Sequence, residues 1–321
     1  MTKAKITVTI TLLLLFTTTL HVTAQYKNNL LVWGSGGYSS LLTDAGKIDS
    51  KGNVGVGVGG GYELHYKWFR LQVGAEFTFL NAGLQIHDFV HDVYLRDNEG
   101  DYYTGHHYFT DNKDMYRMGN INIPLMLGAQ FGGFYFLVGG KAGLNLFTNA
   151  TMSPTLNITG TYDKYIGDFA NIPDHNFGES TDQVKNPVTL GFNAALSAEV
   201  GFYLPIGESK NIKYRLSFFG DYGLLNVHDN SQSQSLMLNI AESPYYKPAL
   251  NNLMLTENMK GSVVNPLYVG VKFTVLFGLI DRGDCMCEPY TRARSTSTKG
   301  SRAASFFRPK ANSTKQARIS K

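Results

Sequence analysis

The sequence predicts an all-β fold, an eight-stranded antiparallel up-and-down transmembrane β-barrel, and three observations support it. Polar and apolar residues alternate along several segments, and short and long links alternate between those segments. No apolar run has the roughly 20 residues that a membrane-spanning helix needs. The clearest segment is 69–79, where six apolar side chains alternate with Arg70, Gln72, Gly74, Glu76 and Thr78. Because successive side chains of a strand point to opposite faces, this segment has one apolar face and one polar face.

The charges in this segment favour a barrel in a bilayer over a soluble sheet. A soluble sandwich rarely buries Arg70 and Glu76 on one side while it exposes aliphatic and aromatic side chains on the other. In a membrane barrel the apolar face meets lipid and the polar face lines the lumen. The mean hydropathy of −0.15 agrees with this, because alternation averages to a value typical of soluble proteins.

The first half of the chain supplies five predicted strands. In segment 30–42 the alternation of polar and apolar residues is weak, because several positions are Gly. Segment 54–66 places Val and Tyr on one face, and Gly, Glu63 and His65 on the other. Segment 69–79 follows after a short link. Segments 121–130 and 134–146 repeat the alternation.

The second half supplies three more strands. Segment 190–203 alternates Leu, Phe, Ala and Val with polar residues that include Glu199. Segment 212–222 sets its apolar residues against Arg215 and others, and segment 267–277 does the same. Eight strands make an even number, as expected of a closed bacterial barrel.

The connections between these strands alternate in length. Short links are expected at 66–69, 131–134 and 205–211, and long loops at 43–53, 85–116, 148–186 and 226–265. Membrane barrels have short periplasmic turns and longer external loops. With a periplasmic N-terminus the first connection is external, and it is one of the long ones.

The chain divides into three predicted parts. Residues 1–24 have a basic start, a short apolar core and small residues before Gln25, which is typical of a cleaved secretory signal peptide. Residues 25–280 form the barrel domain. Residues 281–321 form a basic, disordered periplasmic tail, because they are rich in Ser, Thr, Lys and Arg with little aliphatic content.

The net charge of +4 hides an asymmetry between these parts. The tail carries +7, the signal peptide +2, and residues 25–280 therefore carry −5. The basic character of the chain belongs to its tail, so nucleic acid is not an expected partner.

Segments 57–79 and 265–277 resemble the outer-membrane β-barrel domains, porin-like or OmpA-like, of Bacteroidota-type envelopes. The likeness covers roughly residues 26–280. It implies export to the cell outer membrane of a Gram-negative envelope, with lipid around the barrel. The last strand also resembles the insertion signal that the barrel-assembly machinery reads, at Gly270, Phe273, Val275 and Phe277. That signal usually ends the chain, whereas 44 residues follow Phe277 here.

Charged residues on the polar faces are expected to form a luminal network. An eight-stranded barrel is only wide enough to be filled by side chains, and buried charges need partners. We therefore expect a lumen plugged by salt bridges, with a narrow, gated ion path as the alternative. The predicted members are Glu63, Arg70, Glu76, Lys141, Glu199, Lys213, Arg215, Asp221 and Lys272.

The long loops and the tail offer further candidates. His87, His91, His106 and His107 with neighbouring Asp residues could bind Zn²⁺ or Cu²⁺, with 87 and 91 on one face if that piece is helical. An ordinary polar loop is the favoured interpretation, so no metal and no cofactor is predicted. Cys285 and Cys287 are too close for an unstrained intrachain disulfide. The tail either contacts a cell-wall or periplasmic partner or ends free in solvent.

The sequence predicts a structural or surface-recognition role at the outer membrane. No outward-facing strand presents a His and a Ser two residues apart near the external rim, so no enzymatic activity is expected. Two alternatives stay open, a small porin or transport accessory and an outer-membrane lipid-modifying enzyme.

Overall fold

The computed structural model describes residues 27–97, 99–170, 177–206, 211–228, 233–240 and 246–279. The predicted signal peptide and tail, with Cys285 and Cys287, lie outside the described residues. The strands are β1 (Lys27–Thr43), β2 (Ile48–Tyr66), β3 (Phe69–Ile86), β4 (Phe89–Arg96), β5 (Tyr102–Phe131), β6 (Phe134–Tyr162), β7 (Asp168–Ala170), β8 (Gly178–Ser180), β9 (Val184–Pro187), β10 (Asn193–Leu204), β11 (Ile212–Gly223), β12 (Met237–Asn239), β13 (Pro248–Leu250) and β14 (Val264–Leu279). Two 3₁₀ helices are η2 (Leu253–Leu255) and η3 (Glu257–Met259).

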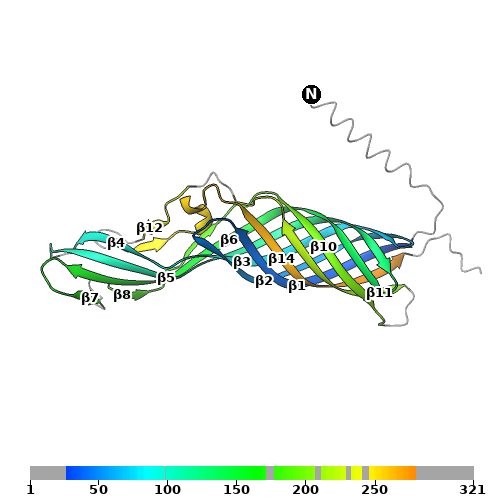
Figure 1. Ribbon diagram of the computed structural model, residues 1–321, viewed down its shortest axis with the longest axis horizontal. Helices are drawn as coiled ribbons and strands as arrows, with labels where there is room; N and C mark the ends of the chain where they lie inside the picture. Colours follow the sequence, from blue (N-terminus) through cyan, green and yellow to red (C-terminus); the bar gives the residue numbers. More distant parts are fainter. Residues whose placement is uncertain are drawn as a thin grey trace, which may run out of the picture. The chain divides into compact units, whose positions relative to one another are not determined.

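Eight of these strands close into a hydrogen-bonded ring in the order β1-β2-β3-β5-β6-β10-β11-β14 (Figure 1). Every neighbouring pair in the ring is antiparallel. The ring closes where β1 pairs with β14, from Asn28 opposite Leu279 to Thr43 opposite Val264. The predicted all-β fold class and the predicted eight-stranded antiparallel ring are confirmed.

The predicted strand ends and loops need correction. The connection expected as a long loop at 43–53 is a tight turn, because β1 ends at Thr43 and β2 begins at Ile48. The loops expected at 85–116 and 148–186 are largely sheet, since β5 spans 30 residues and β6 spans 29. Register shifts at Thr110/Lys113 and Gly119/Asn120 interrupt the alternation there. A bulge moves the side chains that follow it to the other face of the sheet. The strand continues, but its polar and apolar residues no longer alternate without interruption.

The two ends of the barrel differ. The turn end holds the tight connections β2–β3 and β5–β6 at residues 67–68 and 132–133. At the opposite extension end, β5 and β6 run on together beyond the ring (Figure 1). There β4 pairs with β5, while β7, β8 and β9 pair with β6. The sheet formed by β4, residues 102–110 of β5, residues 155–162 of β6, β7 and β8 is called the distal sheet.

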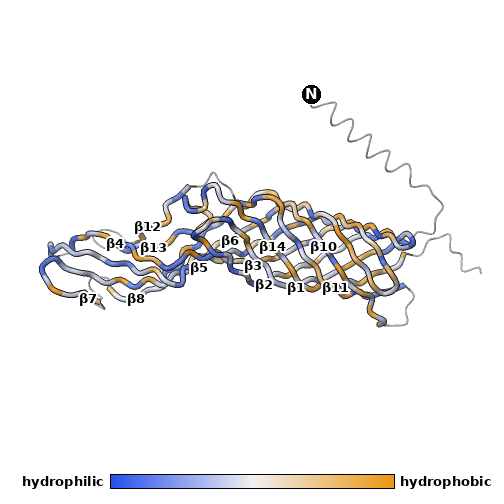
Figure 2. The backbone as a smooth tube through the Cα atoms, viewed as in Figure 1, coloured by the Kyte–Doolittle hydropathy of each residue, from blue (hydrophilic) through white to orange (hydrophobic). Residues whose placement is uncertain are grey.

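The outer surface of the barrel is apolar. Apolar positions recur along every strand of the ring, as Figure 2 shows by colour. On β5, Ile121, Ile123, Leu125 and Leu127 are all exposed, and their neighbours Asn122 and Met126 are buried. Exposed apolar area on this scale marks a surface that contacts lipid or another apolar phase.

No helix among the described residues is both long enough and apolar enough to cross a membrane.

The extension end of the barrel contains the main apolar core. An end plug, defined as residues 246–263, carries η2 and η3 into this end. Its side chains Leu253, Met254, Leu255 and Met259 are buried. They belong to one apolar cluster with Tyr116 and other residues of the barrel wall and the distal sheet. The plug therefore covers the lumen at its extension end.

Candidate functional site

The lumen at the turn end holds a carboxylate between two arginines. Glu63 of β2 forms ion pairs with Arg70 of β3 and, at 2.8 Å, with Arg215 of β11. All three residues are buried. The Arg215 guanidinium lies 4.8 Å from the ring centroid of Tyr135 and 5.6 Å from that of Tyr203. Aromatic faces attract cations, so the two rings support a charge that has left water.

A second group lies further along the lumen. Glu199 of β10 accepts hydrogen bonds from Lys272 Nζ at 2.5 Å, from the Tyr135 hydroxyl at 2.6 Å and from Ser217 Oγ at 2.9 Å. Lys272 Nζ also lies 5.5 Å from the ring of Trp33. Charged partners of this kind make the stronger hydrogen bonds in proteins. The carboxylate is thus well compensated for its burial.

A third group completes the network toward the extension end. Lys141 Nζ of β6 lies 3.0 Å from Glu76 Oε2 of β3 and 2.7 Å from Asp221 Oδ2 of β11. Asp221 also accepts from Ser197 Oγ at 2.6 Å, and Glu76 accepts from Trp33 Nε1 at 3.3 Å. The lysine therefore joins strands on different sides of the ring.

The structure brings together eight of the nine residues predicted for the luminal network. They are four acids and four bases, all buried: Glu63, Arg70, Glu76, Lys141, Glu199, Arg215, Asp221 and Lys272. Lys213, the ninth, is exposed near the turn end, with its Nζ 6.0 Å from the Tyr203 ring. The buried set is neutral, which is the arrangement that a low-dielectric interior tolerates.

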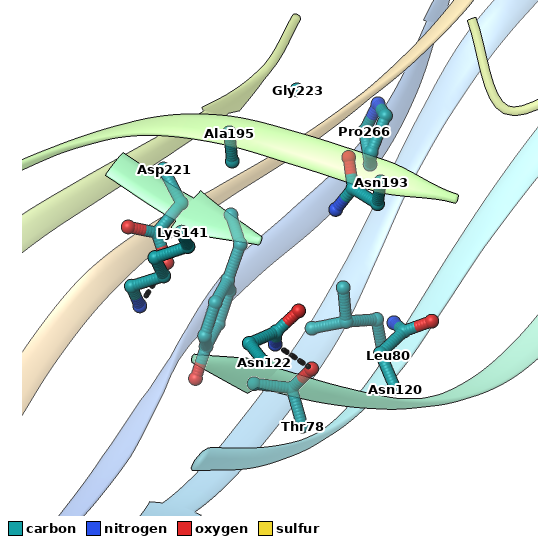
Figure 3. Close-up of a pocket in the computed structure, with 11 residues that line it drawn as sticks. Thr78, Leu80, Asn120, Asn122, Lys141, Asn193, Ala195, Asp221, Gly223 and Pro266 are labelled. Atoms are coloured by element: carbon teal, nitrogen blue, oxygen red, sulfur yellow. Dashed lines mark hydrogen bonds and ion pairs between the residues drawn. The ribbon is translucent and has the colours of Figure 1, made fainter. Parts of the chain in front are cut away.

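A small polar cavity lies between this network and the end plug. Its volume is about 30 Å³, and its walls include Lys141, Asp221, Asn122, Asn193 and Tyr268 (Figure 3). Asn122 donates to Thr78 Oγ1 at 3.2 Å across the cavity floor. A space of this size holds on the order of two water molecules.

Asp114 fastens the end plug to the barrel wall. Its carboxylate accepts hydrogen bonds from Asn252 Nδ2 at 2.8 Å, from the Leu253 backbone N–H at 2.6 Å and from the Tyr116 hydroxyl. The Tyr116 hydroxyl in turn accepts from the Met254 N–H at 3.0 Å. Burial raises the pKa of Asp114 to about 6, and the three donated hydrogen bonds partly oppose that rise.

Little in the sequence indicates this attachment. Asp114 lies inside a segment predicted to be an external loop, and its partners in the plug stand 138 and 139 residues away. One local signal existed: Asp114, Tyr116 and Met118 alternate with Met115 and Arg117, as in a strand with one buried face.

The four histidines predicted on a loop lie in or beside strands of the distal sheet. His91 of β4 stands opposite His107 of β5, with ring centroids 6.2 Å apart. His106 contacts Asp92 Oδ1 at 2.7 Å and Thr161 Oγ1 at 3.0 Å. His87 precedes β4, so the helix considered for residues 87–91 does not form. Across the described residues, no three His, Cys, Asp or Glu side chains meet in a geometry that could hold a metal ion.

The predicted insertion signal lies on the closing strand β14. Phe273 and Phe277 are exposed on the outer face, with Val275 on the same side, while Gly270 has the register of the luminal face.

Comparison with known proteins finds likenesses in structure only. No protein-family model matches the sequence, and no curated protein sequence matches it. Among solved structures, Neisserial surface protein A (NspA) is 6% identical, with 77% of this chain and 96% of that chain covered and a TM-score of 0.31. The outer membrane protease OmpT from Escherichia coli is 8% identical, with 81% and 99% covered and a TM-score of 0.24. The fold assignment itself rests on the closed ring of paired strands.

Proposed function

We propose that this chain is an integral outer-membrane β-barrel with a closed lumen and a structural or surface-recognition role. In this proposal the barrel is an anchor, and the distal sheet is displayed outside the cell. The turn end then faces the periplasm. The proposal assigns no enzymatic activity to the chain.

The observation that carries the proposal is the inverted distribution of polarity around the ring. Four acids and four bases are buried inside the barrel, while exposed Ile, Leu, Val and Phe side chains cover its outside. Water outside would make this arrangement unfavourable, because the apolar area would remain hydrated. A bilayer reverses the balance, and the barrel leaves no open sheet edge within it.

Two features favour anchoring and recognition over transport. The lumen is filled in two layers, by the ion-paired network and by the apolar end plug. The extension end meanwhile carries a paired sheet well beyond the ring, built from β4 to β8. Surface elements positioned by a rigid scaffold commonly carry recognition.

Four sequence-based expectations about biogenesis and partners belong to this proposal. Residues 1–24 direct export and are cleaved, and the last strand is read by the barrel-assembly machinery. Outer-membrane lipid surrounds the ring. The basic tail lies on the periplasmic side, where anionic cell-wall groups or an acidic protein are its candidate partners.

Cysteine labelling of intact cells tests the orientation. In a background with Cys285 and Cys287 changed to Ser, the variant K164C places a thiol at the turn between β6 and β7. The matched variant G133C places one at the tight β5–β6 turn, where a new Cβ meets nothing within 4 Å. A membrane-impermeant maleimide should label K164C on intact cells, and G133C only after the outer membrane is opened.

Two results would contradict the proposal. Equal labelling of both thiols in intact cells would reject the assigned orientation. Recovery of the protein with cytosolic or inner-membrane fractions would reject the outer-membrane location altogether.

A further inference from the structure

The distal sheet has one packed face and one open face. The packed face buries Tyr103 and Phe109 of β5. The other face, called the distal face, carries the side chains that alternate with these. Val90, Tyr94, Tyr102 and Tyr108 lie on it and are 50%, 60%, 49% and 38% exposed. Val90 stands opposite Tyr108, and Tyr94 lies diagonally from Tyr102, with Asp92 and His106 between the two pairs. Exposed tyrosines interleaved with polar residues on one sheet face resemble the composition of interaction surfaces, in which Tyr is enriched.

The aromatic side chains of the distal face are held in place before any partner binds. Tyr94 and Tyr102 stack with centroids 5.4 Å apart and planes only 2° from parallel. The Tyr94 hydroxyl donates to Asp163 Oδ2 at 2.6 Å, and the Arg96 guanidinium lies 5.6 Å from the Tyr102 ring. Side chains that are already ordered lose little conformational entropy on binding. The pair of rings is therefore suited to act as an anchor point.

The net charge around the distal sheet indicates which class of partner the distal face can bind. Residues 86–119 and 146–192, stretches of the sequence that include the distal sheet and the adjoining ring-paired parts of β5 and β6, contain twelve Asp or Glu and five Lys or Arg. The net negative charge of residues 25–280 is therefore concentrated here, and the rest of the barrel is close to neutral. A second copy of the same face would meet like charge, as would an anionic surface. A cationic partner would meet complementary charge and also exposed aromatic rings, which attract Lys and Arg.

We propose that the distal face binds a basic polypeptide segment, with Lys or Arg side chains over the exposed tyrosines and paired with carboxylates such as Asp92 and Asp163. The inference names the partner class for the surface-recognition role and rests on that proposed function. In this complex the stacked rings would provide specificity, and the surrounding negative charge would raise the association rate.

Peptide binding to the full-length protein in lipid nanodiscs tests this inference. The probe is a fluorescent (Arg-Gly)8 peptide, compared with (Glu-Gly)8 and with neutral dextran as competitor, and anisotropy gives Kd at fixed ionic strength. The Arg peptide should bind and the Glu peptide should not. The double variant Y94A/Y102A should bind about tenfold more weakly, since the exposed Tyr94 ring and the Tyr102 ring that stacks on it are both lost.

A matched control separates specific loss from misfolding. F131A removes an exposed aromatic ring at the opposite, turn end of the barrel and should bind like the wild type. Heat-dependent migration on SDS gels should show that all variants remain folded barrels.

Three results would overturn the inference: no preference for the Arg peptide, unchanged affinity of Y94A/Y102A, or displacement of the peptide by dextran. The second would reduce the binding to diffuse charge attraction, and the third would indicate a glycan surface. Because the assay uses purified protein, its failure leaves the K164C labelling result intact, so it is distinguishable from failure of the proposed function.

Discussion

Glu63 lies between two buried arginines and is the residue whose loss should cost the barrel most. The variant E63Q keeps the size of the side chain but removes the negative charge that faces Arg70 and Arg215. Two guanidiniums would then remain buried without a full counter-charge. We expect the free energy of unfolding to fall by about 3 to 5 kcal/mol. Urea unfolding in lipid vesicles, followed by fluorescence of luminal Trp33, measures this loss.

Lys213 provides the matched control at the same scale. It stands two residues before Arg215 on β11, but its side chain is exposed. K213Q should change the free energy of unfolding by less than about 1 kcal/mol, because exposed charge contacts contribute little. If E63Q and K213Q lost the same stability, the buried triad would have no special role.

The seam between β1 and β14 is the element that closes the ring, and it depends on two facing glycines. Gly37 and Gly270 are register partners. A Cβ at Gly270 would lie 2.2 Å from the Gly36 carbonyl oxygen, which no side-chain movement can relieve. G270A should therefore destabilise the closed barrel by about 1 to 3 kcal/mol, as overpacking does elsewhere. The fraction of heat-resistant, fast-migrating barrel on SDS gels reports closure.

G36A is the control for this seam. Its new Cβ would meet nothing within 4 Å, although the residue adjoins Gly37 on the same strand. It should close like the wild type. Gly270 is also part of the predicted insertion signal, so delayed membrane assembly of G270A together with normal stability of the barrel once assembled would point to the signal instead of packing.

The end plug should be held by a contact that depends on pH. The pKa of Asp114 is raised from 3.8 to about 6 by burial. As pH rises from about 4 to 6, the carboxyl ionises first in the detached state, so attachment weakens by about 2 to 3 kcal/mol in total. Above about pH 6 both states are ionised and the loss is complete. Hydrogen exchange of the Leu253, Met254 and Leu255 amides, corrected for intrinsic rates, should show protection falling across this window.

D114N should abolish this pH dependence, because the group no longer titrates. D111N is its control: Asp111 is exposed and lies three residues away, beside the register shift in β5. That variant should keep the wild-type pH profile. A profile that persists in D114N would assign the dependence to another group.

At the scale of the whole molecule, the ring was predictable from sequence and the extension was not. Segment 69–79 alternates without interruption, so its two faces and its luminal Arg70 and Glu76 follow from period two alone. The register shifts in β5 break that period, and so the sequence pattern predicts a loop over 85–116, where β5 in fact begins at Tyr102. The contact of Asp114 with Leu253 depends on tertiary structure, because it joins residues far apart in the chain. Sequence patterns report local geometry and burial, whereas such contacts arise only when the chain closes.

Because the lumen is filled at both ends, we predict that the whole protein does not conduct ions. The ion-paired network lies nearer the turn end, and the plug covers the extension end, so each layer should block ions independently. Planar-bilayer recordings of the wild type should show no steady conductance, since an interior of eight strands is filled by side chains. The variant L253S/M254S/L255S should loosen the plug and remain silent, because the network still fills the barrel. Steady conductance of the wild type would favour the small-porin alternative, and conductance of the plug variant alone would place the seal in residues 246–263 instead of in the charges.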